Sequence, residues 1–121
     1  MKLQKIKYLL LVQDMDRALV FYSSVFGLAP TIKSEWWSEL AFGDSIVALH
    51  GGGDRSERST DLSLQVDNIV VACRLIRENG GSILTEPEKR EGEPIVLATF
   101  NDTEGNAVML TQWVGHGKAL P

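Results

Sequence analysis

The chain has a single cysteine, no long apolar run and no excess of positive charge. Cys73 has no partner for an internal disulfide, which suits a reducing compartment. The apolar runs fall far short of the roughly 18 residues that a membrane-spanning helix requires. There are 12 Lys and Arg residues against 16 Asp and Glu residues, whereas binding to a phosphate backbone calls for a basic stripe. We therefore expect a cytoplasmic protein that has no nucleic-acid or membrane partner.

The sequence also lacks the short motifs of several common active sites. It contains no G-x-S-x-G elbow, no phosphate-binding loop and no paired cysteines at zinc-binding spacing. What it does contain is 121 residues with 44% hydrophobic content, which is enough for one core. We expect a single domain over residues 1–121.

Residues 9–28 combine the signals of a buried strand, a helix cap and an amphipathic helix. Asp14 can accept hydrogen bonds from the free N–H groups of a helix start, and Gly27 can adopt the left-handed conformation that ends one. Residues 62–81 repeat these signals in the same order. The residues matched at an offset of 54 are Leu10 and Leu64, Val12 and Val66, Ala18 and Ala72, and Gly27 and Gly81. Such duplication predicts two similar modules, approximately residues 5–50 and 60–114.

Each module is predicted to have the order β-α-β-β-β. Helices are expected near residues 15–27 and 69–80. Strands are expected at residues 9–12, 29–34, 35–42, 45–49, 61–66, 82–86, 94–101 and 106–114, with Pro87 ending the strand at 82–86. Residues 51–60 contain no apolar side chain and are predicted to form an exposed loop, either a linker or a lid. Residues 88–93 are expected to form a charged loop, and residues 115–121 a frayed tail.

The pattern of residues 9–28 resembles the first module of the vicinal oxygen chelate superfamily. This superfamily includes glyoxalase I, bleomycin-resistance proteins and extradiol dioxygenases. The segment TFNDTEGNAVMLTQ resembles its last hairpin, in which a D-x-x-G turn precedes the final strand. The resemblance covers about residues 5–114. It implies a glyoxalase-like α+β fold, in which two βαβββ modules form a curled mixed-sheet cup with the helices outside, and it implies a homodimer.

Strand alternation assigns side chains to the helix side or to the cup side of each strand. The helix side receives mainly aliphatic residues and Phe42. The residues assigned to the cup side are Lys7, Leu9, Leu11, Trp37, Glu39, Ala41, Ile46, Ala48, His50, Asp61, Ser63, Gln65, Ala107, Met109, Thr111 and Trp113. An apolar cup with a few polar groups and two tryptophans is typical of a small-molecule site.

The resemblance also provides a test for a metal site. Metal-dependent members carry His, Glu or Gln on the cup side of the first, fourth, fifth and last strands. These positions correspond here to Lys7, Ala48, Asp61 and Met109. Of the four, only Asp61 offers a good ligand for a hard divalent ion. We therefore predict no metal and no other cofactor, and we expect the Lys7 ammonium to occupy the cation position and to pair with Asp61.

Two functional hypotheses follow. The first is a metal-independent small-molecule-binding protein resembling the bleomycin-resistance members, with acidic groups suited to a cationic ligand. Its expected ligand-binding residues are Lys7, Trp37, Glu39, His50, Asp61, Gln65, Met109 and Trp113. The second is a glyoxalase-like lyase or isomerase, or a dioxygenase, with a shifted divalent-metal site formed by His50, Glu39 and Asp61. Acid–base chemistry by Lys7, His50 and Asp61 without a metal is a variant of the second hypothesis. The tryptophans could instead pack in the core or in a dimer interface.

Overall fold

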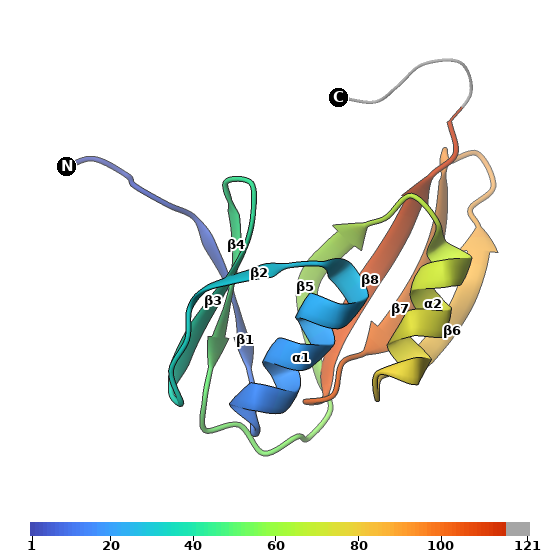
Figure 1. Ribbon diagram of the computed structural model, residues 1–121. Coiled ribbons are helices and arrows are strands. Elements are labelled where there is room, and N and C mark those ends of the chain that lie inside the picture. The colour runs from blue at the N-terminus through green and yellow to red at the C-terminus, as the bar shows by residue number, and fades with distance from the viewer. Residues whose placement is uncertain (116–121) are drawn as a thin grey trace.

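The computed structural model describes residues 1–115, and most of the expected tail, including His116, lies outside the described residues. Two modules follow each other along the chain (Figure 1). The first consists of β1 (Lys7–Leu11), α1 (Met15–Phe26), β2 (Ala29–Ile32), β3 (Trp37–Phe42) and β4 (Ser45–His50). The second consists of β5 (Arg58–Gln65), α2 (Ile69–Glu78), β6 (Ser82–Lys89), β7 (Ile95–Asn101) and β8 (Asn106–Trp113).

Each module forms its own four-stranded mixed sheet. The strand orders are β1-β4-β3-β2 and β5-β8-β7-β6. The first and last strands of each module are parallel, and the remaining pairs are antiparallel. In Figure 1 the first sheet lies to the left of α1 and the second to its right. The predicted α+β fold with two βαβββ modules is confirmed, and the two sheets remain separate instead of closing into one.

Both helices begin with the predicted caps. The side chain of Asp14 accepts a hydrogen bond from the backbone N–H of Arg17, and Asn68 does the same for Val71. At the end of α1, Gly27 has a φ of 67°, in the left-handed region that favours glycine. No helix within residues 1–115 is long and apolar enough to cross a membrane.

Some predicted boundaries are wrong. Helix α2 ends at Glu78, short of the predicted residue 80, and the left-handed residue after it is Gly80 rather than Gly81. Strand β5 begins at Arg58, within the segment predicted as a loop. Strand β6 continues through Pro87 to Lys89. This strand lies at the edge of its sheet and its register shifts around the proline, so no ladder hydrogen bond is needed there.

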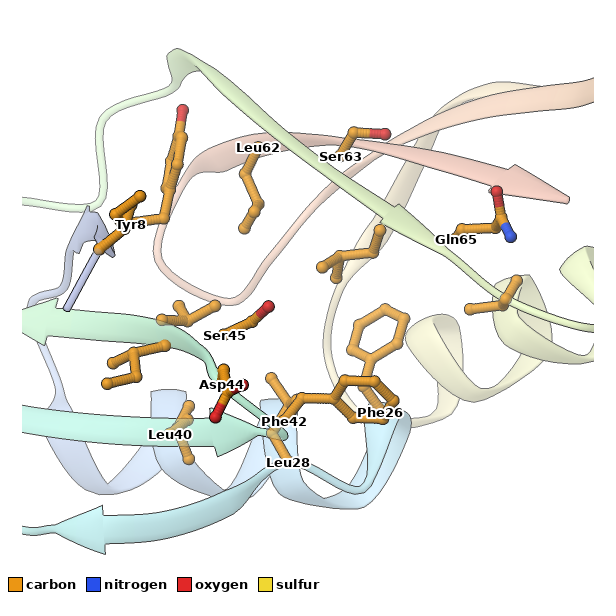
Figure 2. A pocket seen from close by; sticks show the side chains of 15 residues that line it. Tyr8, Phe26, Leu28, Leu40, Phe42, Asp44, Ser45, Leu62, Ser63 and Gln65 are labelled. Atoms are coloured by element: carbon orange, nitrogen blue, oxygen red, sulfur yellow. The ribbon is translucent and has the colours of Figure 1, made fainter. Parts of the chain in front are cut away.

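A cavity of about 770 Å³ lies between the first sheet and β5, on the side of the sheets that faces the helices. Tyr8 of β1 lies beside Leu62 of β5 on one side of it, and Leu40, Leu28 and Phe26 lie on the side nearer α1 (Figure 2). The cavity exists because the two sheets are not closed against each other.

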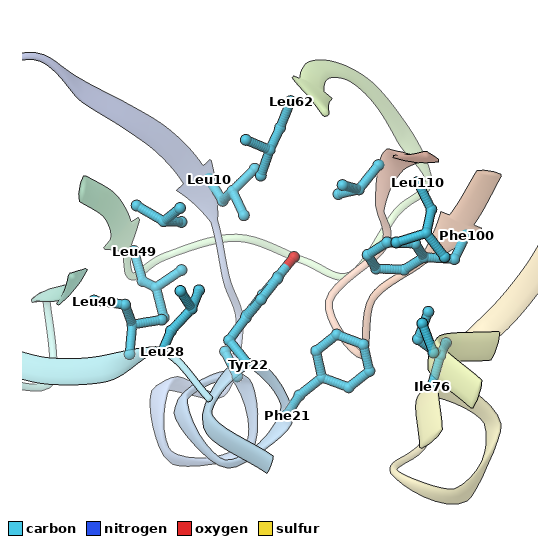
Figure 3. Close-up of a cluster of buried hydrophobic side chains, with 14 of the residues drawn as sticks. Leu10, Phe21, Tyr22, Leu28, Leu40, Leu49, Leu62, Ile76, Phe100 and Leu110 are labelled. Carbon is cyan, nitrogen blue, oxygen red and sulfur yellow. The ribbon is translucent and has the colours of Figure 1, made fainter. Parts of the chain in front are cut away.

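One hydrophobic core extends through both modules. Helix α1 supplies side chains to each part (Figure 3). Tyr22 lies close to the apolar residues of the first sheet, whereas Phe21 packs toward the second module, with its ring centroid 6.1 Å from that of Phe100. Both rings are almost fully buried, at 0% and 1% exposure. Because one helix fills two modules, its position determines how the two sheets are held relative to each other.

A buried carboxylate in the turn between β7 and β8 fixes the start of α1. Glu104 has no exposed surface. Its Oε1 accepts hydrogen bonds from the backbone N–H groups of Gln13 and Asp14, both at 2.9 Å. Its Oε2 lies 2.7 Å from Nε of Arg17. The second module thereby binds the N-terminus of a first-module helix, where negative charge is favourable.

The same turn also binds α1 through Asp102. The Tyr22 hydroxyl donates to Oδ2 of Asp102 at 2.6 Å, and Oδ1 of Asp102 accepts from the backbone N–H groups of Glu104 and Asn106. Burial, followed by the nearby Asp102 carboxylate, raises the pKa of Tyr22 well above its usual value. At Gly105 an added Cβ would lie 2.5 Å from a backbone oxygen of the preceding loop, so the turn requires glycine.

Replacing this carboxylate should cost stability. We expect Glu104→Gln to lower the free energy of unfolding by about 3 kcal/mol, because the variant leaves the Arg17 guanidinium without its buried partner. Urea denaturation measures the change. The control is Glu78→Gln, whose carboxylate lies 3.6 Å from Arg74 on the surface and should contribute less than about 0.5 kcal/mol. Equal effects of the two variants would contradict this role for Glu104.

The same contacts predict a pH dependence. Burial alone would raise the pKa of Glu104, but Arg17 and the hydrogen bonds from Asp14, Thr103 and Gln13 outweigh burial and lower the pKa from 4.5 to about 2. A lowered pKa in the folded state stabilises the protein above the unfolded pKa, and this contribution is lost as the pH falls toward the folded pKa. The difference in stability between the wild type and Glu104→Gln should therefore shrink between pH 4.5 and pH 2.

Candidate functional site

Four of the expected ligand-binding residues lie together on the cup side of the first sheet. Trp37 and Glu39 are two residues apart on β3, and His50 is directly opposite Trp37 on β4. Lys7 reaches them from β1, and its Nζ lies 2.6 Å from Oε2 of Glu39. The Trp37 indole Nε1–H donates to the same oxygen at 2.8 Å. We call Lys7, Trp37, Glu39 and His50 the first-sheet cluster.

The two charged members of the first-sheet cluster differ in exposure. The side chain of Glu39 is 3% exposed, whereas that of Lys7 is 38% exposed. The hydrogen bond from Lys7, followed by that from Trp37, lowers the pKa of Glu39, and Lys5 contributes a weaker electrostatic effect in the same direction. Glu39 is therefore ionised at neutral pH and directs its charge inward to its partners, so the open face presents the lysine ammonium.

Two aromatic rings lie beside this ion pair. The Trp37 and His50 rings are nearly perpendicular, with centroids 6.1 Å apart. Nζ of Lys7 lies 5.9 Å from the centroid of the Trp37 ring, close enough for a weak cation–π attraction. His50 is exposed. The cluster thus offers a cation, an indole and an imidazole on one open face.

The predicted pair between Lys7 and Asp61 is wrong within this chain. Asp61 is exposed on β5, in the other sheet, and its backbone N–H donates to the Tyr8 hydroxyl. The expectation assumed that the two sheets curl into one cup. Because they stay separate, Lys7 finds its carboxylate within its own sheet, at Glu39 of β3, on the far side of β4.

The other four expected residues, namely Asp61, Gln65, Met109 and Trp113, all belong to the second sheet. Met109 on β8 is 43% exposed. Trp113 is partly buried, and its indole nitrogen has no hydrogen-bond partner among residues 1–115. Gln65 lines the 770 Å³ cavity. The structure therefore brings four of the eight expected residues together and leaves the other four on a separate sheet.

Lys5 is a site residue that the sequence reasoning missed. It lines a depression of about 590 Å³, together with Thr31, Ala41, Asp44 and Ile46. Ala41 and Ile46 belong to the cup side of the first sheet, and Lys7 pairs with Ile46 in the strand register. The depression therefore adjoins the first-sheet cluster. Strand alternation could have identified Lys5, because it lies two residues before Lys7 and therefore falls on the same cup side of the chain.

The larger cavity, in contrast, opens on the opposite side of the first sheet from the cluster. Phe42 was expected in the core, but it is 71% exposed and lies at the cavity edge. Phe42 ends β3 at the hairpin turn, near the C-terminal end of α1, where Phe26 and Leu28 also line the cavity. Phe42 does lie on the helix side of the sheet, as expected. It stays exposed because no helix or strand among the described residues covers it there.

The residues at the implied metal positions do not fit a divalent ion. Lys7 is cationic and is bound to Glu39. Ala48 has no exposed surface and no donor atom, and Met109 offers only a thioether. The described part of the chain contains no group of three His, Cys, Asp or Glu residues placed to hold a metal ion. The alternative set of His50, Glu39 and Asp61 therefore does not converge within one chain.

Comparison with known proteins agrees with this architecture. Residues 5–110 match the family model described as Glyoxalase/Bleomycin resistance protein/Dioxygenase superfamily. Among curated relatives, the lactoylglutathione lyase of Escherichia coli O157:H7 is 30% identical over 127 residues, covering 93% of this chain and 94% of that enzyme. The lactoylglutathione lyase of Haemophilus influenzae is 29% identical over 118 residues, covering 85% of this chain and 87% of that enzyme.

Solved structures show the same fold at lower identity. A member of the Glyoxalase/bleomycin resistance protein/dioxygenase superfamily from Sphaerobacter thermophilus has a TM-score of 0.75 at 19% identity, covering 92% of this chain and 98% of that one. The fosfomycin resistance protein FosX from Listeria monocytogenes also has a TM-score of 0.75, at 14% identity, covering 93% of this chain and 94% of that one. The family match spans most of the chain, and the chain therefore belongs to the Glyoxalase/Bleomycin resistance protein/Dioxygenase superfamily.

Proposed function

We propose that this chain is a metal-independent small-molecule-binding protein, of the kind represented in its superfamily by bleomycin-resistance proteins. The observation that carries the proposal is the contact between Nζ of Lys7 and Oε2 of Glu39 at 2.6 Å. The resemblance implies a metal ligand at the position of Lys7, and an ammonium group held there would repel a second cation. The exposed His50 ring and the partly exposed Trp37 ring beside it supply the aromatic surface that small organic ligands need.

The alternative is a glyoxalase-like lyase or isomerase, or a dioxygenase. It is favoured by one observation, the 30% identity to lactoylglutathione lyase over nearly the whole chain. Against it stand Lys7, Ala48 and Met109, which leave Asp61 as the one good donor of the implied set. An enzyme without a metal would depend on His50 as its proton-transfer group. A metal titration separates the metalloenzyme from the binding protein.

We also propose that the protein is a homodimer. Strands β1 and β5 each lie at the edge of a sheet, where unpaired backbone groups favour a further partner. On β1, Leu9 is 50% exposed and Leu11 is 40% exposed. An exposed apolar edge strand is typical of an interface between protein chains.

The ion pair should show coupling between its partners. Lys7→Met leaves a buried carboxylate without its cation, and Glu39→Gln leaves the ammonium without its anchor, so each single variant should lower the melting temperature. The double variant should lower it by less than the sum of the two single effects. The exposed pair of Arg74 and Glu78 is the control and should show no measurable coupling. Additive effects at Lys7 and Glu39 would contradict the pairing.

Added divalent ions should not stabilise the protein. We expect nickel, zinc and manganese to leave the melting temperature unchanged, and we expect a dialysed sample to retain no stoichiometric metal, because binding to the folded state alone would raise the melting temperature. Thermal melts and elemental analysis measure this. A clear rise that is abolished by His50→Ala would overturn the proposal and favour the metalloenzyme.

Sedimentation equilibrium should give twice the chain mass of 13.4 kDa at micromolar concentration. Leu11→Glu should shift the protein toward a single chain, because a carboxylate would be buried at the edge of β1. Val20→Glu, at a 61% exposed position on α1, is the matched control and should leave the mass unchanged. A single-chain mass for the wild type would rule out the dimer.

A further inference from the structure

The first-sheet cluster leaves a hydrogen-bonding cation on its open side. A lysine ammonium has three N–H donors, and among the described residues the side chain of Lys7 donates only to Glu39. Glu39 cannot act as the ligand-facing charge, because its side chain is 3% exposed while that of Lys7 is 38% exposed. Two donors of the ammonium are therefore free to bind an acceptor on a ligand.

The charges around the cluster also favour a negatively charged ligand. Lys7 pairs with the carboxylate of Glu39, and Lys5, which lines the adjoining depression, adds a second positive charge on this side of the sheet. Asp44 is the one acidic residue that lines the adjoining depression, and it lies at the hairpin turn after β3. Asp61, which was expected to attract a cationic ligand, belongs to the other sheet. A cationic ligand would therefore find neither of the two carboxylates expected to attract it, because Glu39 is paired with Lys7 and Asp61 lies in the other sheet.

The surface beside Lys7 includes an exposed apolar side chain. Leu9 is 50% exposed and lies two residues from Lys7 on the same side of β1. Trp37 and His50 continue this surface with their rings. A ligand bound to Lys7 would therefore contact an indole and aliphatic groups within the same site.

We propose that the ligand is a small aromatic carboxylate, whose carboxylate accepts hydrogen bonds from the Lys7 ammonium and whose planar body packs against Trp37. This inference rests on the function proposed above and specifies its ligand class. Glu39 is then a positioning residue, because it orients Lys7 without contacting the ligand.

Matched pairs of carboxylates and amides test this inference. The probes are benzoate and benzamide, 2-naphthoate and 2-naphthamide, and indole-3-acetate and indole-3-acetamide. Binding is followed by NMR through the Trp37 indole N–H signal, which is assigned by its loss in Trp37→Phe. We expect at least one carboxylate to bind roughly tenfold more tightly than its amide, since a hydrogen bond from a charged donor favours a charged acceptor.

The preference should depend on Lys7. Lys7→Met should abolish it and Lys7→Arg should retain part of it. Lys89→Met, which removes a lysine that donates to backbone carbonyls at the end of β6 in the other sheet, should leave it unchanged. Equal affinity for carboxylate and amide, preference for the amide, or binding by no carboxylate would overturn the inference.

A parallel screen with neutral and cationic aromatic compounds separates this inference from the proposed function. If such compounds shift the Trp37 signal while the carboxylates do not, the site binds small molecules of another class, and the ligand assignment alone is wrong. If no compound of any charge binds, and divalent ions stabilise the protein, the proposed function fails as well.

Discussion

The buried carboxylate of Glu104 is the contact on which the rest of the structure depends. It accepts hydrogen bonds from the backbone N–H groups of Gln13 and Asp14, which directly precede α1, and it forms an ion pair with Arg17. Burying an ionised group is costly unless it is paired and hydrogen-bonded, and here both conditions are met. The interaction joins residues about 90 positions apart, so it can form only when both modules are folded. It therefore fixes the first helix relative to the second sheet.

The position of α1 in turn determines which surfaces remain for a ligand. The helix supplies Tyr22 to the first part of the core and Phe21 to the second. The helix side of each sheet is thereby committed to packing, except at the cavity where the sheets separate. The opposite side of the first sheet remains open, and there the polar groups satisfy each other locally. The ion pair of Lys7 and Glu39 is a consequence of sheets that are oriented by α1 but not closed.

The sequence predicted the elements that depend on local signals. Asp14 and Asn68 cap their helices and Gly27 ends α1, because capping requires only a short side chain or a glycine at the right place. Alternation assigned Lys7, Trp37 and Glu39 to one face correctly. It could not identify the partner of Lys7, because that depends on whether the two sheets close, which no local pattern encodes. The exposure of Phe42 and the start of β5 at Arg58 depend on the same long-range arrangement.

The difference between local signals and long-range arrangement also explains how the chain can keep the fold of its superfamily while the side chains on its open faces vary. The fold is specified by helix caps, by core residues such as Tyr22 and by the turn that carries Glu104. The positions at Lys7, Asp61 and Met109 lie on open faces and contribute little to the core. An ammonium group at such a position needs only one nearby carboxylate to balance its charge, and Glu39 provides it. Membership of the superfamily therefore determines the architecture of this chain, whereas its chemistry depends on a few side chains that the architecture leaves free to change.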